Sequence, residues 1–167
     1  MYLQSAASTP EAARVPEFRV RLAVEADFPG LLAMGGEMHA ENGIMPMNIP
    51  KVTAMIAEAI RQRGSIAGVI GQVGNPEAAI LLRVSQFWYS EECHLEDFLC
   101  YVRPEFRKSS RAKSLIKFAK ASAKSIGVPL LIGVASNKRT EAKVRLYRRE
   151  VGDPVGALFL YNGKTGI

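Results

Sequence analysis

The amino-acid sequence predicts a mixed α/β fold in which a mostly antiparallel central sheet is flanked by helices. Three observations support this prediction. Residues 18–24, FRVRLAV, alternate apolar and basic side chains as a half-buried strand does. Three later apolar runs follow one another through short turns, which favours an antiparallel meander. After Pro104 the apolar residues recur with the period of a helix. The predicted order of elements is β-α-α-β-β-β-α-β-α-β.

Two helices are predicted directly after the first strand. Asp27 precedes the apolar FPGLLAM segment and is the expected N-cap of the first helix. The segment at 42–50, NGIMPMNIP, has the composition of a loop. Pro50 opens a second amphipathic helix that runs through Arg63, and Gly64 is placed to end it. The region between the first and second strands is therefore expected to be helix, loop and helix.

Three strands are predicted next, at 65–72, 77–89 and 94–102, separated by the turn residues VGNP and by a short polar link. A long helix follows Pro104, with Gly127 as its C-cap. This helix lies between two strands, so we expect them to be parallel neighbours joined by a crossover. The last three predicted elements are a short apolar strand at 129–135 of the kind buried on both faces, a helix at about 138–150 and a strand at 155–163.

The length and composition are those of an ordinary globular protein. With 167 residues the chain suits one domain, expected over 17–167 behind a loosely ordered lead-in at 1–16. Cys93 and Cys100 have no further Cys/His pair at metal spacing, so we expect reduced thiols and no metal site. No apolar run reaches the roughly 18 residues needed to span a membrane, and no secretory signal is found. We expect a cytoplasmic protein without a membrane partner.

Basic charge is concentrated in one part of the chain. The net charge is +6, and more than half of the 22 Lys and Arg residues lie between Arg103 and Arg149. This suits nucleic acid, an anionic surface or a phosphorylated small molecule. The basic stretch VRPEFRKSSRAK lies where the long helix begins, and the free N–H groups and dipole of a helix N-terminus favour phosphate. The candidate phosphate-binding residues are Arg107, Lys108, Ser109, Ser110, Arg111, Ala112 and Lys113.

Neither of two common phosphate loops, G-x-x-x-x-G-K-[ST] and G-x-G-x-x-G, is present. RKSSRA resembles the Q/R-x-x-G-x-G/A loop of the GCN5-related N-acetyltransferase (GNAT) superfamily, and VRPEFR supplies the V-x-P that precedes it there. Ser110 stands where the family has glycine, at a position expected to favour positive φ. VRLAVEADFPGLLAM is similar to the family's first strand and helix, and SNKRTEAKVRLYRREVG to a late segment. The resemblance covers about residues 18–162 and implies a GNAT-like fold.

The resemblance implies acetyl-CoA as co-substrate and direct transfer of an acetyl or other short acyl group to a primary amine. It places the pantetheine arm against the main chain of Tyr101 and Val102, and the pyrophosphate on loop 107–112. Asn137 matches the asparagine that contacts the arm. Tyr147 matches the tyrosine that lies near the thioester sulfur and protonates the departing thiolate. No metal is implied.

A carboxylate is needed to accept the proton of the attacking amine. Glu96 is the expected base, because it precedes Val102 by six positions on its strand and resembles the glutamate of the histone-acetylating members. Simple alternation places Glu96 on the same face as Cys100, which we interpret as core packing, and Asp97 on the opposite face. His94 ranks behind Glu96 as a base.

Two other functions remain open at the sequence level. One is a basic nucleic-acid-binding module, although the basic region lacks interleaved exposed aromatic residues and matches no common nucleic-acid motif. The other is a CoA-binding relative without turnover. The acceptor amine is not identified by any residue. Because the chain stops soon after the predicted strand at 155–163, a second subunit in a homodimer is one way to complete the sheet.

Overall fold

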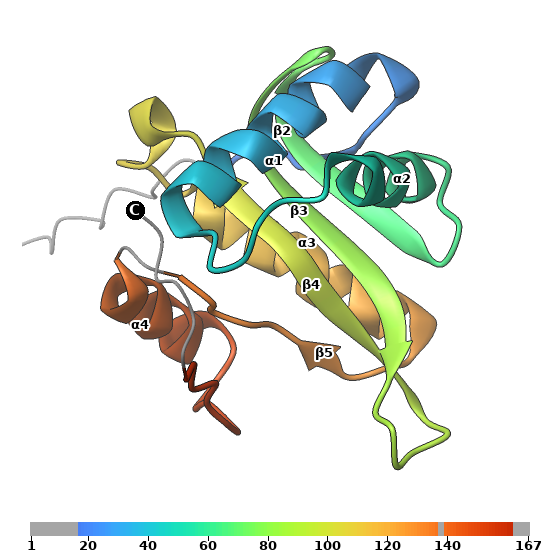
Figure 1. The fold of residues 1–167 in the computed structure, drawn as a ribbon, viewed down its shortest axis with the longest axis vertical. Coiled ribbons are helices and arrows are strands. Elements are labelled where there is room, and N and C mark those ends of the chain that lie inside the picture. The colour runs from blue at the N-terminus through green and yellow to red at the C-terminus, as the bar shows by residue number, and fades with distance from the viewer. Residues whose placement is uncertain (1–16, 137–138, 162–167) are drawn as a thin grey trace, which may run out of the picture.

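The protein is described by a computed structural model that covers residues 17–136 and 139–161 (Figure 1). The predicted order of elements is confirmed from the first strand to the last helix. Two short 3-10 turns, Glu25–Asp27 and Pro104–Phe106, precede α1 and α3. The strands are β1 Arg21–Leu22, β2 Ser65–Gln72, β3 Asn75–Gln86, β4 Cys93–Val102 and β5 Leu130–Leu131, and the helices are α1 Phe28–Asn42, α2 Ile49–Ile60, α3 Arg111–Ile126 and α4 Thr140–Glu150.

The described strands form one five-stranded sheet in the order β1-β2-β3-β4-β5. The first three pairings are antiparallel, and only β5 runs parallel to its neighbour β4, with Leu95 opposite Leu130. The helix α3 is the crossover that parallel neighbours require, and Gly127 ends it with φ of 71° in the left-handed region. The sequence prediction of a mostly antiparallel sheet with one parallel crossover is confirmed.

Helices cover both faces of the sheet. In Figure 1, α1 and α2 lie in front of the strands and α3 lies behind them. On the first face, Leu31 of α1 and Ile56 of α2 pack in one buried cluster with Leu99 of β4. On the second face, Leu115 of α3 packs with Ile80 of β3. Burial of these side chains fixes β3 and β4 between two apolar layers, so β4 is a firm support for residues near its end.

A β-bulge in β4 changes which side chains face which layer. Leu81 of β3 lies opposite Leu99, but the next residue, Leu82, lies opposite Asp97, so Phe98 has no partner across the ladder. The extra residue reverses the alternation of side chains for the part of β4 before it. Asp97 therefore points to the α3 face, as Cys100 does. The predicted placement of Glu96 with Cys100, and of Asp97 on the other face, is wrong for this reason.

Asp27 has a different role from the predicted N-cap. Its side chain is fully buried and makes no capping hydrogen bond to α1. Instead its carboxylate accepts hydrogen bonds from Arg21 at 2.7 and 2.9 Å and from the main-chain N–H groups of Val24 and Gly74. The hydrogen bond from Arg21 is the main cause that lowers the pKa of Asp27 to about 2. The hydrogen bond from Gly74 ties the segment after β1 to the turn between β2 and β3.

The C-terminal region differs from the prediction. Only Leu130 and Leu131 pair with β4, and both are half-buried, so the expected strand at 129–135 is a short edge strand and is not buried on both faces. The described part of the predicted strand at 155–163 is not a strand, and Val155 and Phe159 are 93% and 95% exposed. A strand needs a neighbouring edge with free N–H and C=O groups, and β5 offers only two residues. None of the described helices is both long and apolar enough to span a membrane.

Candidate active site

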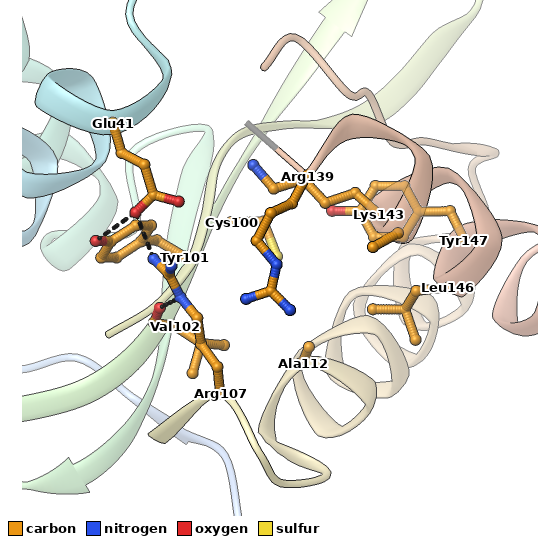
Figure 2. A pocket seen from close by; sticks show the side chains of 11 residues that line it. Glu41, Cys100, Tyr101, Val102, Arg107, Ala112, Arg139, Lys143, Leu146 and Tyr147 are labelled. Atoms are coloured by element: carbon orange, nitrogen blue, oxygen red, sulfur yellow. Dashed lines mark hydrogen bonds and ion pairs between the residues drawn. The ribbon is translucent and has the colours of Figure 1, made fainter. Parts of the chain in front are cut away.

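A cavity of about 180 Å³ lies between the end of β4, the beginning of α3 and the helix α4 (Figure 2). It has two walls. The sheet wall consists of Cys100, Tyr101, Val102, Arg107 and Ala112, and the α4 wall consists of Arg139, Ala142, Lys143, Leu146 and Tyr147. Glu41, at the end of α1, also lines the cavity.

Three polar side chains of the α4 wall follow one another at helical spacing. Arg139, Lys143 and Tyr147 are four residues apart, so they share one face of α4, and this face is turned toward β4 (Figure 2). Arg139 precedes the helix with φ of 57°, in the left-handed region that is rare for residues other than glycine. The helix therefore presents a guanidinium, an ammonium and a phenol in a row along the cavity.

Tyr147 and Cys100 both line the cavity, and each contributes to the pKa of the other, so their side chains lie close together. Burial raises the pKa of the Cys100 thiol to about 12, and it also raises the pKa of Tyr147, so both groups are protonated at neutral pH. A neutral phenol can donate a proton, whereas a thiol of such high pKa is a poor nucleophile. This geometry agrees with the interpretation that Cys100 is not catalytic.

Asp97 is a carboxylate on the same face of β4 as Cys100. Its Oδ1 accepts a hydrogen bond of 2.8 Å from the main-chain N–H of Gly133. Burial raises the pKa of Asp97 to about 6 despite this hydrogen bond. Its charge in turn contributes to the raised pKa values of Cys100 and Tyr147, which places the three groups in one electrostatic cluster.

Arg107 is engaged by neighbouring groups on the sheet wall. Its Nε donates to the carbonyl oxygen of Val102 at 2.9 Å, and its Nη2 lies 2.5 Å from the carboxylate of Glu41. Tyr101 donates from its hydroxyl to the same carboxylate at 3.3 Å. Burial raises the pKa of Glu41, but the hydrogen bond and charge of Arg107 outweigh it and the net shift is downward. Glu41 is therefore a carboxylate anion in the cavity.

The rest of the predicted phosphate loop is only partly directed toward a ligand. Arg111 binds Glu77 and lies 3.9 Å from the ring centroid of Phe18, so its guanidinium holds α3 against the sheet. Ser110 begins α3 with φ of −83°, so the expectation of positive φ at this position is wrong and serine fits without strain. Of the remaining candidates, Ala112 lines the cavity and Lys108 is exposed. The Ser109 hydroxyl donates to the carbonyl of Phe106. The Lys113 ammonium lies 3.7 Å from the carboxylate of Glu150.

Glu96 lies away from the cavity lining. Its carboxylate is 2.6 Å from Nε of Arg83, and His94 lies 3.6 Å from it on the other side. Burial raises the pKa of Glu96, but the hydrogen bond and charge of Arg83 outweigh this effect, and the net pKa is lowered. A carboxylate that is held by arginine is a weak proton acceptor. His94 is itself buried against Phe87.

Asn137 lies outside the described residues, so its predicted contact with the pantetheine arm stays a prediction. The sequence interpretation did not include Glu41, Arg139 and Lys143, and it placed Asp97 on the opposite face of β4 from the expected base. The four-residue spacing of Arg139, Lys143 and Tyr147 is a signal that could have found two of them. Glu41 gives no comparable signal, because it meets Arg107 only through the packing of α1 beside β4.

No protein-family model matches the sequence, and no curated protein matches it. Solved structures do match. An acetyltransferase of Trypanosoma brucei has a TM-score of 0.64 and 17% identity, covering 87% of this chain and 99% of its own. A predicted acetyltransferase of Clostridium acetobutylicum, solved with acetyl-CoA, has a TM-score of 0.68 and 14% identity, covering 86% of this chain and 96% of its own.

Another similar structure is the aminoglycoside 6'-N-acetyltransferase AAC(6')-IG of Acinetobacter haemolyticus. Its TM-score is 0.65 at 13% identity, and the match covers 89% of this chain and 99% of that protein. At these identities the likeness is one of fold. The fold of the chain is the one that these acetyltransferases share, and the resemblance read from the sequence is confirmed at that level.

Proposed function

Because the chain has the fold of the GNAT acetyltransferases, we propose that it transfers an acetyl or other short acyl group from acyl-CoA to a primary amine. The observation that carries the proposal is the cavity between β4 and α4. It has cationic side chains along one side and a neutral, half-buried tyrosine beside Cys100 of β4. This arrangement suits an elongated anionic thioester whose reactive end leaves as a thiolate.

The cationic residues of the cavity are the proposed phosphate-binding groups. Arg107 and Arg139 approach from opposite walls, beside the N-terminus of α3, whose first main-chain N–H groups favour an anion. The pantetheine arm would lie along Tyr101 and Val102. Because Arg107 donates to the Val102 carbonyl, binding of the arm to that oxygen requires the arginine to turn toward the phosphates. Lys108, which follows Arg107 in the chain, is exposed to solvent.

The proposed reaction is direct attack of a neutral amine on the thioester carbonyl. The Tyr147 hydroxyl, which is protonated at neutral pH, donates its proton to the departing thiolate. Main-chain N–H groups near Val102 and the β4 bulge would stabilise the tetrahedral oxyanion. An enzyme that uses direct transfer needs no acyl-cysteine.

The structure changes which residue we propose as the base. Asp97 lies on the same face of β4 as Cys100 and has a pKa of about 6, whereas Glu96 lies on the other face, paired with Arg83. A general base works best when its pKa is near the working pH. We therefore assign proton acceptance to Asp97, directly or through water, in preference to Glu96.

Calorimetry with CoA and a free-thiol assay over a panel of amines test the proposal together. We expect CoA to bind in the micromolar range and free CoA to appear with at least one amine. Arg107→Glu should abolish binding, whereas Lys124→Glu, on an exposed position near the end of α3, should leave it unchanged. Absence of CoA binding by the parent protein would reject the proposal.

Binding of nucleic acid receives less support from the structure. Three arginines of the basic stretch are neutralised, since Arg103, Arg107 and Arg111 pair with Glu37, Glu41 and Glu77 respectively. To bind a phosphate backbone through this face, the protein would have to break three ion pairs, whereas the proposed CoA site requires only Arg107 to turn away from Glu41. A homodimer stays a prediction, and sedimentation or light scattering of the full chain tests it.

A further inference from the structure

Lys143 places an amine inside the cavity where the proposed thioester reacts. It precedes Tyr147 by one helical turn, so both side chains lie on the face of α4 that is turned toward Cys100 (Figure 2). Lysines 117 and 120 of α3 do not line the cavity, and they bind Glu17 and the carbonyl of Glu150 respectively. Lys143 therefore differs from these lysines in lying at the reactive site.

The Lys143 ammonium is held by neutral partners. Its Nζ donates to Oγ of Ser136 at 2.8 Å and to Oδ1 of Asn42 at 3.1 Å. Asn42 is buried and fixed at the end of α1. Neither partner is an anion, so neither opposes loss of the ammonium proton as a carboxylate would. A fixed amine beside a bound reactant also reacts with a high effective concentration.

Desolvation adds a second, weaker argument. Burial is the largest cause of the lowered pKa of Lys143, and the positive charges of Arg107 and Arg139 act in the same direction. Glu41 and Cys100 oppose these effects, and the net shift is downward. A larger fraction of Lys143 is therefore neutral at a given pH than for a solvated lysine.

We propose that Lys143 is an acyl acceptor within the protein and is modified by the acyl-CoA bound in its own cavity. This inference rests on the proposed function. The neutral Nζ attacks the thioester carbonyl, so an N–C bond forms and the C–S bond breaks. The thiolate takes a proton from Tyr147, and the proton released by Nζ passes through solvent or Asp97 back to the phenolate. The products are an Nζ-acyl-lysine and CoA, with no change of oxidation state.

Acylation of Lys143 has a consequence for the cavity. The amide carries no charge, so the α4 wall retains Arg139 as its cation, while Arg107 is already paired with Glu41. An anionic co-substrate is then held less strongly, and an acyl group occupies space beside Tyr147. Acylation at Lys143 therefore limits further turnover, because an amide does not return its acyl group to CoA under ordinary conditions.

The test is incubation of the full chain with acetyl-CoA and no added amine, followed by intact mass measurement and peptide mapping. We expect one acetyl group on Lys143, added on the order of 100-fold faster than on exposed Lys51 or Lys124. These two exposed lysines measure uncatalysed acetylation in the same sample. Lys143→Arg should lose the modification, and Tyr147→Phe should slow it.

Calorimetry with CoA on the same preparation separates two kinds of failure. If CoA binds and amines of the panel are acetylated, yet Lys143 stays unmodified or reacts no faster than the exposed lysines, the inference is wrong and the proposed function stands. If CoA does not bind, both fail. Weaker CoA binding by the acetylated protein and by Lys143→Gln than by Lys143→Arg would be the expected result for the loss of charge.

Discussion

The two walls of the cavity differ in how firmly the rest of the molecule holds them. Three of the five residues of the sheet wall belong to β4, which is packed between α1 and α2 on one face and α3 on the other. The α4 wall belongs to a helix in which no residue of the described range is buried. Figure 1 shows α4 beside the sheet, joined to it through β5. The cavity therefore has one wall that is packed into the apolar core and one wall that is not.

This difference suggests a division of tasks. The sheet side holds the proposed base, Asp97 of β4, whose carboxylate accepts a hydrogen bond from the main-chain N–H of Gly133. The α4 wall brings Arg139, Lys143 and Tyr147 toward it along one helical face. Elements with few buried contacts open at low free energy, so α4 is the element expected to move when an elongated ligand enters the cavity.

The largest expected effect concerns the base on the sheet side. Asp97→Asn keeps the size of the side chain and an oxygen for the Gly133 N–H but cannot accept a proton at neutral pH. We expect the rate of acyl transfer to fall by about 10² to 10⁴. Glu96→Gln is the matched control one residue away, and it should change the rate by less than about tenfold, since Glu96 is paired with Arg83.

Steady-state rates with saturating acetyl-CoA and an amine that works with the parent protein measure this pair. The reverse order, with Glu96→Gln inactive and Asp97→Asn active, would return the base to Glu96. That result would also show that the bulge at Phe98 does not decide which carboxylate serves the reaction.

The second prediction compares how much a side chain of β4 and one of α4 contribute to the free energy of unfolding. Leu99 of β4 is 6% exposed in the apolar core, and Leu146 of α4 is only half-buried. Leu99→Ala should lower the free energy of unfolding by about 2 to 5 kcal/mol. Leu146→Ala should lower it by less than about 1 kcal/mol. Urea denaturation followed by circular dichroism measures both, and equal losses would contradict a weakly held α4 wall.

The sequence predicted the sheet better than the site, and particular residues show why. Alternation and turn composition give strands 65–72 and 94–102 nearly to their ends, and Gly127 marks the C-cap of α3. These signals are local, because each depends on a few neighbouring residues. The segment 155–161 has the same apolar character but no edge on which to pair. The strand propensity of this segment therefore predicted a strand that its described part does not form.

The site depends on contacts that a local pattern does not contain. One unpaired residue, Phe98, reverses the faces of Glu96 and Asp97, and nothing in HLEDFLCYV marks the bulge. Arg107 meets Glu41 across 66 positions in the chain. The basic stretch was correctly predicted to lie at a helix N-terminus, but the acids that neutralise part of it come from α1 and β3. Net charge in a segment thus does not reveal how much of it is free.

A third prediction follows from the raised pKa of Asp97. The folded state binds the proton more tightly than the unfolded chain, because the pKa is about 6 in place of 3.8. The carboxylate therefore lowers stability as pH rises from about 4 through 6, and this loss persists at neutral pH. Asp97→Asn should stabilise the protein at pH 7 by about 1 to 3 kcal/mol and have little effect near pH 4.

Ionisation of Asp97, which lowers stability, should raise the rate of acyl transfer. Acyl transfer by the parent protein should fall about tenfold per pH unit below pH 6, where Asp97 becomes protonated. Thermal melts at the two pH values and a pH–rate profile are the measurements. Asp97→Asn that is less stable than the parent at pH 7 would indicate that the carboxylate is not strained by burial.

The smallest expected effect tests the α4 wall at its exposed end. Arg139→Asn removes the guanidinium but retains a residue that tolerates left-handed φ, so α4 should still begin at the same place. We expect CoA affinity to weaken about tenfold, the effect of one charge-assisted contact to phosphate. Arg145→Asn is the control on the same helix, since Arg145 is exposed and near Glu141. Calorimetry measures both variants, and equal affinities would mean that the α4 wall supplies no phosphate contact and that the sheet wall binds the co-substrate alone.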